Sequence, residues 1–346
     1  MDTRDTPEQA ELRRTARQLA RELGPRTVVD FDDAKRARRL ADAVRDAGWL
    51  ELRQQGDDGG PLASGVEAAI IADALGEAVV DVAFTGPVLA ADLARRAGVH
   101  AVDGAVVGFA PDLIGPARVS GRTTTNAVHA VDCAAQGPAI AYVLAPEGDR
   151  YRIVQVPVDG AREGADLTRT IRPIPAGVPV SEVAGSRLLT RRDLEAWAAF
   201  GLALTSADLV GLMRGVIDLT VAYAQERRQY GVAIGTFQAV QHLLAEARCL
   251  MEGALSAALY PAWAVDALDA DDARMAGRVA KAYCARAART VCETAVQVHG
   301  GMGNTWECMV HVYLRRALLS SRWFGDDGEQ LRELQRSRLG VADGLS

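Results

Sequence analysis

The chain has 346 residues, of which 49% are hydrophobic and 24% are charged, and its formal net charge at pH 7 is −6. This composition is typical of a soluble globular protein of two or three domains, and the negative charge excludes a general nucleic-acid binder. We expect no membrane span, because no apolar run approaches the ~20 residues that a span needs.

The first hundred residues are predicted to be helical. Apolar residues recur at helical spacing up to Leu23, and Gly24-Pro25 ends that segment. Further apolar helices are predicted near 34–47, over 66–75 and over 86–97, each followed by a glycine.

Short β-type runs separated by Gly, Pro, Asn and Asp begin near Val102 and continue to about Leu188. Residues 139–144 and 151–156 are predicted to be two of these strands. Residues 146–149, Pro-Glu-Gly-Asp, are predicted to form the hairpin turn between them.

Long helical runs return from Arg191 to Arg338. The order of helices, a small β region and further helices predicts an α+β chain in which the two classes are segregated. We expect three domains: a helical domain over 1–101, a reduced β-domain over 102–188, and a helical domain over 189–346 that carries the candidate binding motifs.

The cysteines and the N-terminus indicate the compartment. Residues 1–5 are polar and lack the apolar core of a signal peptide. The five cysteines form no Cys-x-x-Cys pair and have no metal-ligand spacing with histidine. We therefore expect reduced, mostly buried cysteines, no metal site and a cytoplasmic protein.

The first candidate binding segment follows a helix predicted over 203–228. Arg227 and Arg228 lie at its C-terminal end, where the helix dipole favours cations, and a solvated helix end is the simplest interpretation of this pair. Gln229-Tyr230-Gly231 and Phe237-Gln238 follow at once, however. A guanidinium can donate to two phosphate oxygens, and a glutamine carboxamide can pair with the polar edge of a flavin or adenine.

The second candidate segment, Gln297 to Gly303, ends a helix predicted near 272–297. Gly300, Gly301 and Gly303 let the backbone pass close to a ligand or take a positive φ, although a plain helix C-cap has the same composition. The segment is not a dinucleotide-binding fingerprint, because no strand precedes it.

In order and separation, the two segments resemble the signatures of the acyl-CoA dehydrogenase family: Arg227-x-Gln229-Tyr230-Gly231, Phe237-Gln238, Gln241 and Gln297-x-x-Gly300-Gly301-x-Gly303. Residues 298–307 and the residues up to Arg316 resemble the branch that includes subunits of actinobacterial dehydrogenases of sterol side-chain and other bulky CoA thioesters. The resemblance implies the acyl-CoA dehydrogenase fold, with an N-terminal helical domain, a middle β-domain and a C-terminal four-helix bundle.

In that family FAD lies extended at a subunit interface. The resemblance implies that Arg227 contacts the pyrophosphate, that Tyr230 packs against the cofactor and that Gln238 contacts the adenine or ribityl region. Gln297 and Gly301 are implied to line the adenosine part. The candidate FAD-contacting residues are Arg227, Tyr230, Gln238, Gln297, Gly300 and Gly301.

The flavin-ring half of the family site is missing from the sequence. Residues 104–127 contain Phe109-Ala110-Pro111 but no segment resembling the Thr-Glu-Pro-x-x-Gly-Ser-Asp that holds the ring. The usual catalytic glutamate falls on Phe324, within Trp323-Phe324-Gly325-Asp326, and the alternative position used by a minority of the family falls on Gly201. Phenylalanine and glycine cannot accept the α-proton that dehydrogenation releases.

Three other carboxylates lie near these two positions in the sequence, and none is predicted to act as a base. Glu195 lies six residues before Gly201, about 240° around a helix, and should face elsewhere. Asp326 and Glu329 fall in what reads as a polar, solvated tail. We therefore assign no catalytic residue to this chain.

These features predict the short subunit of an α2β2 heterotetrameric, FAD-dependent acyl-CoA dehydrogenase. A longer partner subunit would carry the catalytic glutamate, the acyl-CoA would be oxidised to the 2,3-enoyl-CoA, and electrons would pass to an electron-transfer flavoprotein. A role in steroid degradation is implied by the resemblance alone. Two alternatives stay open: a stand-alone homo-oligomeric flavoenzyme with a displaced base, and a structural subunit that binds no flavin.

Overall fold

The computed structural model describes residues 4–134, 139–159 and 164–339, and every statement below concerns those residues. The outer limits of the predicted terminal domains, residues 1–3 and 340–346, lie outside the described residues, as does part of the polar segment 1–5.

The N-terminal part is helical, as predicted. Capping boxes start two of its helices: Thr6 with Gln9 begins α1, and Ser64 with Glu67 begins α3, so that each pair satisfies two backbone N–H groups that the first turn leaves free. The elements are α1 (Pro7–Leu23), η1 (Val28–Asp32), α2 (Ala34–Asp46), η2 (Trp49–Glu51), α3 (Gly65–Glu77) and α4 (Thr85–Arg96).

The β region forms one six-stranded sheet in the order β5-β2-β1-β3-β4-β6. Its strands are β1 (Val106–Phe109), β2 (Val128–Val131), β3 (Ala139–Glu147), β4 (Arg150–Val158), β5 (Ile171–Ile174) and β6 (Ser181–Glu182). The turn between β3 and β4 is tighter than predicted, because Pro146 pairs with Tyr151 and Glu147 with Arg150. Only Gly148 and Asp149 remain in the turn, and Gly148 takes a φ of 64°.

Long helices make up the C-terminal part. They are α5 (Arg191–Glu226), α6 (Gln238–Ala267), α7 (Ala270–His299), α8 (Val310–Arg322) and α9 (Asp327–Arg338), with the short elements β7 (Arg228–Gln229), β8 (Val232–Ala233), η3 (Ile234–Thr236) and η4 (Gly300–Asn304) between them. The helix predicted over 203–228 is longer, since a capping box of Thr190 and Asp193 starts it at Arg191.

Helix α5 corrects the expectation that no apolar run is long enough for a membrane span. By length and composition it is the one helix of the described residues that could cross a membrane, but 89% of its apolar window is buried inside the chain. It is a core helix, packed against α3, α6, α7 and α8.

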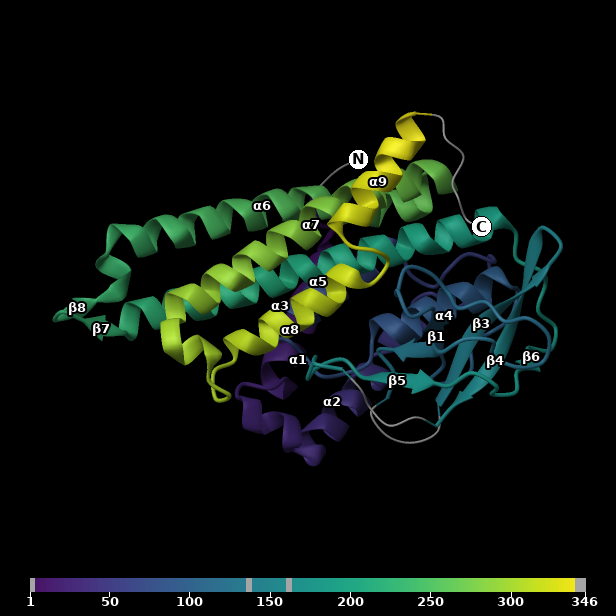
Figure 1. Cartoon of the computed structure of the whole chain (residues 1–346), viewed down its shortest axis with the longest axis horizontal. Coiled ribbons are helices and arrows are strands. Elements are labelled where there is room, and N and C mark those ends of the chain that lie inside the picture. The colour runs from purple at the N-terminus through teal and green to yellow at the C-terminus, as the bar shows by residue number, and fades with distance from the viewer. Residues whose placement is uncertain (1–3, 135–138, 160–163, 340–346) are drawn as a thin grey trace.

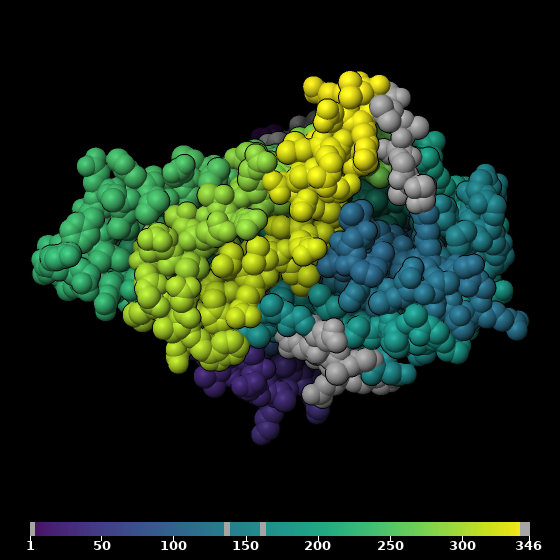
Figure 2. All heavy atoms as spheres, viewed as in Figure 1, coloured from purple at the N-terminus to yellow at the C-terminus, as the bar shows by residue number. Residues whose placement is uncertain are grey.

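The long helices lie between two different ends of the molecule. Helices α5, α6, α7 and α8 pack against one another, with the sheet near one end and the β7–β8 hairpin at the other (Figure 1). In the space-filling view the hairpin end, in green, projects beyond the rest of the surface (Figure 2). One buried apolar cluster contains residues of helices α1 through α5 and of strands β1 and β3. A second contains residues of helices α5 through α8.

The cysteines are mostly shielded from solvent, as predicted. Cys133, Cys284 and Cys292 are buried, Cys308 is half-buried and Cys249 is exposed, and all five are free thiols. Burial raises the pKa of Cys133 to about 11 and the pKa values of Cys284 and Cys292 to about 12, so these buried thiols are neutral and unreactive at pH 7.

Candidate functional site

The two candidate binding segments meet at the hairpin end of the long helices. Tyr223, near the end of α5, stacks on His299, the last residue of α7, with ring centroids 4.1 Å apart and an interplanar angle of 17°. The Tyr223 hydroxyl lies 3.8 Å from the Met302 sulfur. We call the exposed candidate residues at this end the motif surface: Arg227, Tyr230, Gln238, Gln297, Gly300 and Gly301.

The hairpin of the motif surface has a tightly specified backbone. Arg227 ends α5 in an extended conformation, and its carbonyl oxygen accepts the Ile234 N–H at 2.8 Å. Tyr230 and Gly231 have positive φ values of 52° and 81°, as two-residue hairpin turns with the favoured twist require. This turn leaves the Tyr230 side chain 94% exposed, edge-on to Phe237 with ring centroids 6.3 Å apart.

Three polar side chains of the motif surface are not used by the fold. Among the described residues, Arg227, Gln238 and Gln297 make no side-chain hydrogen bond or ion pair, and all three are exposed. Gln241, one turn after Gln238, is different, because its Nε2 donates to the Gly235 carbonyl oxygen at 3.0 Å. Gln238 is the first residue of α6, where the helix dipole favours anions.

The glycines of the second segment differ in what they do. Gly303 is required by packing, since a Cβ there would lie 2.8 Å from the Val296 carbonyl oxygen. Gly300 has a φ of 59°, and a Cβ at Gly300 or at Gly301 would meet nothing within 4 Å. The backbone at Gly300 and Gly301 is therefore bare and open toward solvent, which suits the close approach of another molecule.

His299 supports this surface as a structural residue. Burial lowers the pKa of His299, although its hydrogen bond to the Ala295 backbone opposes the shift, so the ring is neutral at pH 7. Its Nδ1 lies 2.9 Å from the Ala295 carbonyl oxygen, which accepts the ring hydrogen.

A closed aromatic cluster occupies the region around Phe324, the position that matches the family's usual catalytic glutamate. Phe324 lies 5.2 Å from Trp197 and 5.4 Å from Phe109, and Phe109 lies 5.7 Å from Trp323, between ring centroids. All four side chains are buried. We call Phe109, Trp197, Trp323 and Phe324 the aromatic cluster.

The two positions to which the family pattern assigned a base face each other. A Cβ at Gly201 would lie only 2.0 Å from Cζ of Phe324, so the phenylalanine ring fills the space above the glycine. Phe324 has a φ of 67°, which is rare for a bulky residue. Hydrogen bonds hold that backbone: the Phe324 N–H donates to the Leu113 carbonyl at 2.8 Å, and Gln330 Nε2 donates to the Phe324 carbonyl at 2.6 Å.

None of the three alternative carboxylates lies free in a pocket. Glu195 pairs with Arg191 at 2.8 Å and lies 3.7 Å from Arg274. Asp326 accepts the Glu329 N–H at 2.9 Å and so caps α9. Asp326 is exposed, in agreement with the interpretation of a solvated segment, whereas Glu329 is half-buried, because Asp327–Arg338 is a helix packed against α7.

A buried ionic network lies behind the aromatic cluster, and the sequence reasoning missed it. Asp208 accepts from Arg316 at 2.6 Å and from Ser320 at 2.7 Å, and it pairs with Arg169 at 3.1 Å. The Arg169 guanidinium carbon lies 5.1 Å from the centre of the Trp323 ring. Burial alone would raise the pKa of Asp208, but Arg169 and Arg316 outweigh it and hold that pKa below its ordinary value. An ionisable residue within the apolar run of α5 was the available signal.

Comparisons with known proteins agree with this arrangement. A family model described as "Acyl-CoA dehydrogenase, C-terminal domain" matches residues 199–339. The acyl-CoA dehydrogenase IpdE2 of Mycobacterium tuberculosis is 29% identical over 95% of this chain and 97% of its own length. The acyl-CoA dehydrogenase FadE34 of the same organism is 38% identical over 48% of this chain, and the matched part is 23% of FadE34.

Solved structures show the same fold over nearly the whole chain. The ChsE4-ChsE5 complex from Mycobacterium tuberculosis aligns with a TM-score of 0.79 and 20% identity, over 98% of this chain and 99% of the matched chain. A Tcur3481-Tcur3483 steroid acyl-CoA dehydrogenase variant aligns with a TM-score of 0.76 and 22% identity, over 97% and 99% of the two chains. At these identities the likeness concerns the fold.

Proposed function

This chain belongs to the acyl-CoA dehydrogenase family, and from this premise we propose that it is the non-catalytic subunit of a heteromeric acyl-CoA dehydrogenase. In this proposal it contributes the adenosine and pyrophosphate half of an FAD site. A longer partner subunit supplies the catalytic glutamate and the pocket for the thioester. The family is FAD-dependent, and bound FAD supplies the acceptor for the hydride that leaves the acyl chain.

The observation that carries the proposal is the contact between Phe109 and Phe324. Phe109 ends β1, inside the segment 104–127 that lacks the family's ring-holding motif, and Phe324 stands at the usual base position. Two apolar rings with centroids 5.4 Å apart can neither donate to a flavin ring nor accept a proton. The residues present do not fit the isoalloxazine ring or the reacting part of a substrate.

The motif surface, by contrast, fits the other half of the cofactor. Arg227 would hold the pyrophosphate through its planar fork, at the end of α5 beside the N-terminus of α6. Tyr230 would pack against the cofactor, and Gln238 would contact its adenine or ribityl region. Gln297, with the bare backbone of Gly300 and Gly301, would line the adenosine. The unpaired state of the three polar side chains supports these roles.

The remaining features of the assembly follow from the same proposal. The domains would run over 1–101, 102–188 and 189–346, and the long helices of the last would form the family's four-helix bundle. The assembly would be a cytoplasmic α2β2 heterotetramer that passes electrons to an electron-transfer flavoprotein. Its substrate class would be a bulky acyl-CoA, and a steroid thioester is suggested by the name of one structural relative.

The two alternatives are less well supported. A stand-alone enzyme needs a free base, whereas Glu195 and Glu329 pair with arginines and Asp326 caps a helix. A purely structural subunit has no need of three exposed, unpaired polar side chains beside an open glycine backbone.

Flavin stoichiometry tests the proposal. The chain purified alone should bind little FAD, and the complex formed by co-expression with its partner dehydrogenase should hold one FAD per pair of unlike chains. Replacing the partner's catalytic glutamate with glutamine should abolish turnover and leave FAD bound. One FAD per chain in protein made from this sequence alone would overturn the heteromer.

A further inference from the structure

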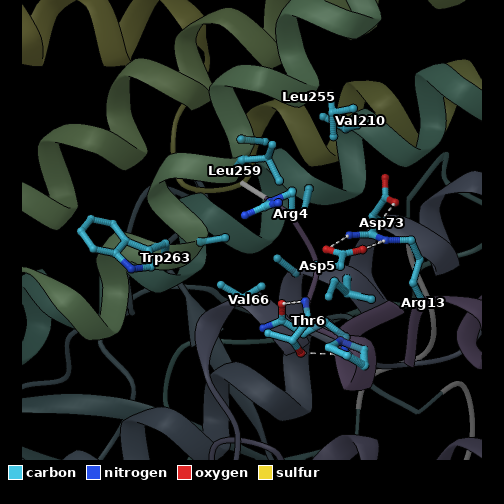
Figure 3. A pocket seen from close by; sticks show the side chains of 17 residues that line it. Arg4, Asp5, Thr6, Arg13, Val66, Asp73, Val210, Leu255, Leu259 and Trp263 are labelled. Atoms are coloured by element: carbon cyan, nitrogen blue, oxygen red, sulfur yellow. Dashed lines mark hydrogen bonds and ion pairs between the residues drawn. The ribbon is translucent and has the colours of Figure 1, made fainter. Parts of the chain in front are cut away.

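A second concave site lies on the opposite side of α5 from the aromatic cluster. It is a pocket of about 580 Å³ bounded by α1, the residues that lead into it, α3, α5 and α6 (Figure 3). Val210 lines it from α5, nine residues after Gly201 and thus about 180° around that helix. The pocket is separate from the candidate base position and from the motif surface.

The walls of the pocket are apolar. Leu255 and Leu259 of α6 face Val66 of α3 across it, Val210 lies beside Leu255, and Trp263 lies at one side (Figure 3). Three helices thus present aliphatic side chains to one space.

Small residues create that space. Ala69, Ala207, Ala258 and Ala262 line the pocket where larger side chains would fill it. Its volume lies within the ~300–1,000 Å³ of typical small-molecule sites, which are mostly apolar with a few polar groups at the edge.

The mouth of the pocket is polar, and its charges are compensated. Arg13 donates to Asp5 at 2.8 and 3.0 Å and to Asp73 at 3.3 Å. Asp73 also accepts from Arg214 at 2.8 Å. These contacts neutralise the mouth and hold the segment before α1 across it, and Arg4 lies over the apolar wall beside Leu259 (Figure 3).

We propose that this pocket binds a neutral, largely apolar small molecule, at a site that shares no residue with the motif surface. An ionic ligand would have to disrupt the Asp5–Arg13–Asp73 contacts or lose its hydration beside them. A neutral ligand gains from the apolar walls and leaves those contacts intact. The inference does not depend on the proposed function.

Two dyes that share one ring system test the ligand class. N-phenyl-1-naphthylamine is neutral, and 1-anilinonaphthalene-8-sulfonate adds a sulfonate to the same rings. With the purified full chain, fluorescence titration of the neutral dye should saturate at one per chain, and the anionic dye should bind at least tenfold more weakly to the same site. Absence of saturable binding by the neutral dye, or equal binding of both dyes, would overturn the proposal.

Adjacent variants on α6 locate the site. Ala258 is buried and lines the pocket, whereas Ala257 is half-buried and does not. Ala258→Leu should weaken binding of the neutral dye at least tenfold, and Ala257→Leu should leave the binding affinity unchanged. Where circular dichroism shows that Ala258→Leu is misfolded, Leu259→Trp fills the same space from a half-buried position.

The remaining outcomes count against the proposal. If a correctly folded Ala258→Leu or Leu259→Trp variant binds the neutral dye with wild-type affinity, the dye binds elsewhere. The same conclusion follows if Ala257→Leu loses as much affinity as Ala258→Leu. A dye that binds the isolated chain but not the chain within its assembly would show that a protein surface covers the mouth. None of these results bears on flavin stoichiometry, so the proposal and the proposed function fail separately.

Discussion

The motif surface and the aromatic cluster are two halves of one family pattern with opposite physical states. Arg227, Gln238 and Gln297 are exposed and unpaired, so the fold does not account for them. Phe109 and Phe324 are buried in mutual contact, so packing accounts for them fully. The comparison teaches that packing explains the aromatic cluster, whereas nothing within the described residues explains the exposed polar side chains of the motif surface.

The largest expected effect breaks the aromatic cluster. Phe324→Ala should lower the free energy of unfolding by about 3–5 kcal/mol, because it removes a buried ring and leaves a cavity between Trp197 and Phe109. Urea denaturation measures the loss, with the exposed Tyr230→Ala as a control that should change stability by less than about 0.5 kcal/mol. Equal stability of the two variants would mean that Phe324 is not a packing residue.

The next effect concerns the motif surface. Arg227→Ala should remove a charge-assisted contact of ~1.5–3 kcal/mol with the pyrophosphate and so weaken FAD retention by the complex roughly ten- to a hundredfold. Arg227→Lys should restore only part of it, since an ammonium lacks the bidentate fork. Equilibrium dialysis of flavin measures the change, and the neighbouring Arg228→Ala is the matched control. If Arg227→Ala leaves the flavin affinity unchanged, Arg227 is only a solvated residue at the end of α5.

A pH-dependent effect is expected on the buried side. Lys281 is fully buried, its Nζ donates to the Ser320 carbonyl oxygen, and burial lowers its pKa to about 7. In the unfolded chain the pKa of this lysine is ~10.4. Between pH 7 and that value the unfolded chain binds more protons than the folded chain, so the free energy of unfolding rises with pH. From pH 7 to 9 the wild type should gain about 2 kcal/mol relative to Lys281→Met. Parallel stability curves for the two proteins would show that Lys281 titrates normally.

The smallest effect is expected at the carboxylates outside both regions. Glu195→Gln, Asp326→Asn and Glu329→Gln should each leave the turnover of the complex within about twofold of the wild type, since a true general base contributes ~10²–10⁴-fold. Steady-state kinetics at matched flavin content measures this. A hundredfold loss in any one variant would show that this chain has its own active site and is not a non-catalytic subunit.

The sequence by itself determined the local features of this protein. Glycines and apolar spacing act within a few residues, so helices such as α2, predicted near 34–47 and observed as Ala34–Asp46, could be bounded from the sequence. The motif order identified the family, and counting along it placed Gly201 and Phe324 at equivalent base positions, which the structure brings into contact. The roles of the six motif-surface residues remain predictions.

Only the tertiary structure decided which distant residues meet. Phe109 and Phe324 are far apart in the sequence, and no local sequence pattern predicts that their rings are in contact. The same holds for the ionic network around Asp208 and for the packing of α9 against α7. Cavities and buried pairs depend on how whole elements pack, because side-chain volume and desolvation act between neighbours in space rather than along the chain.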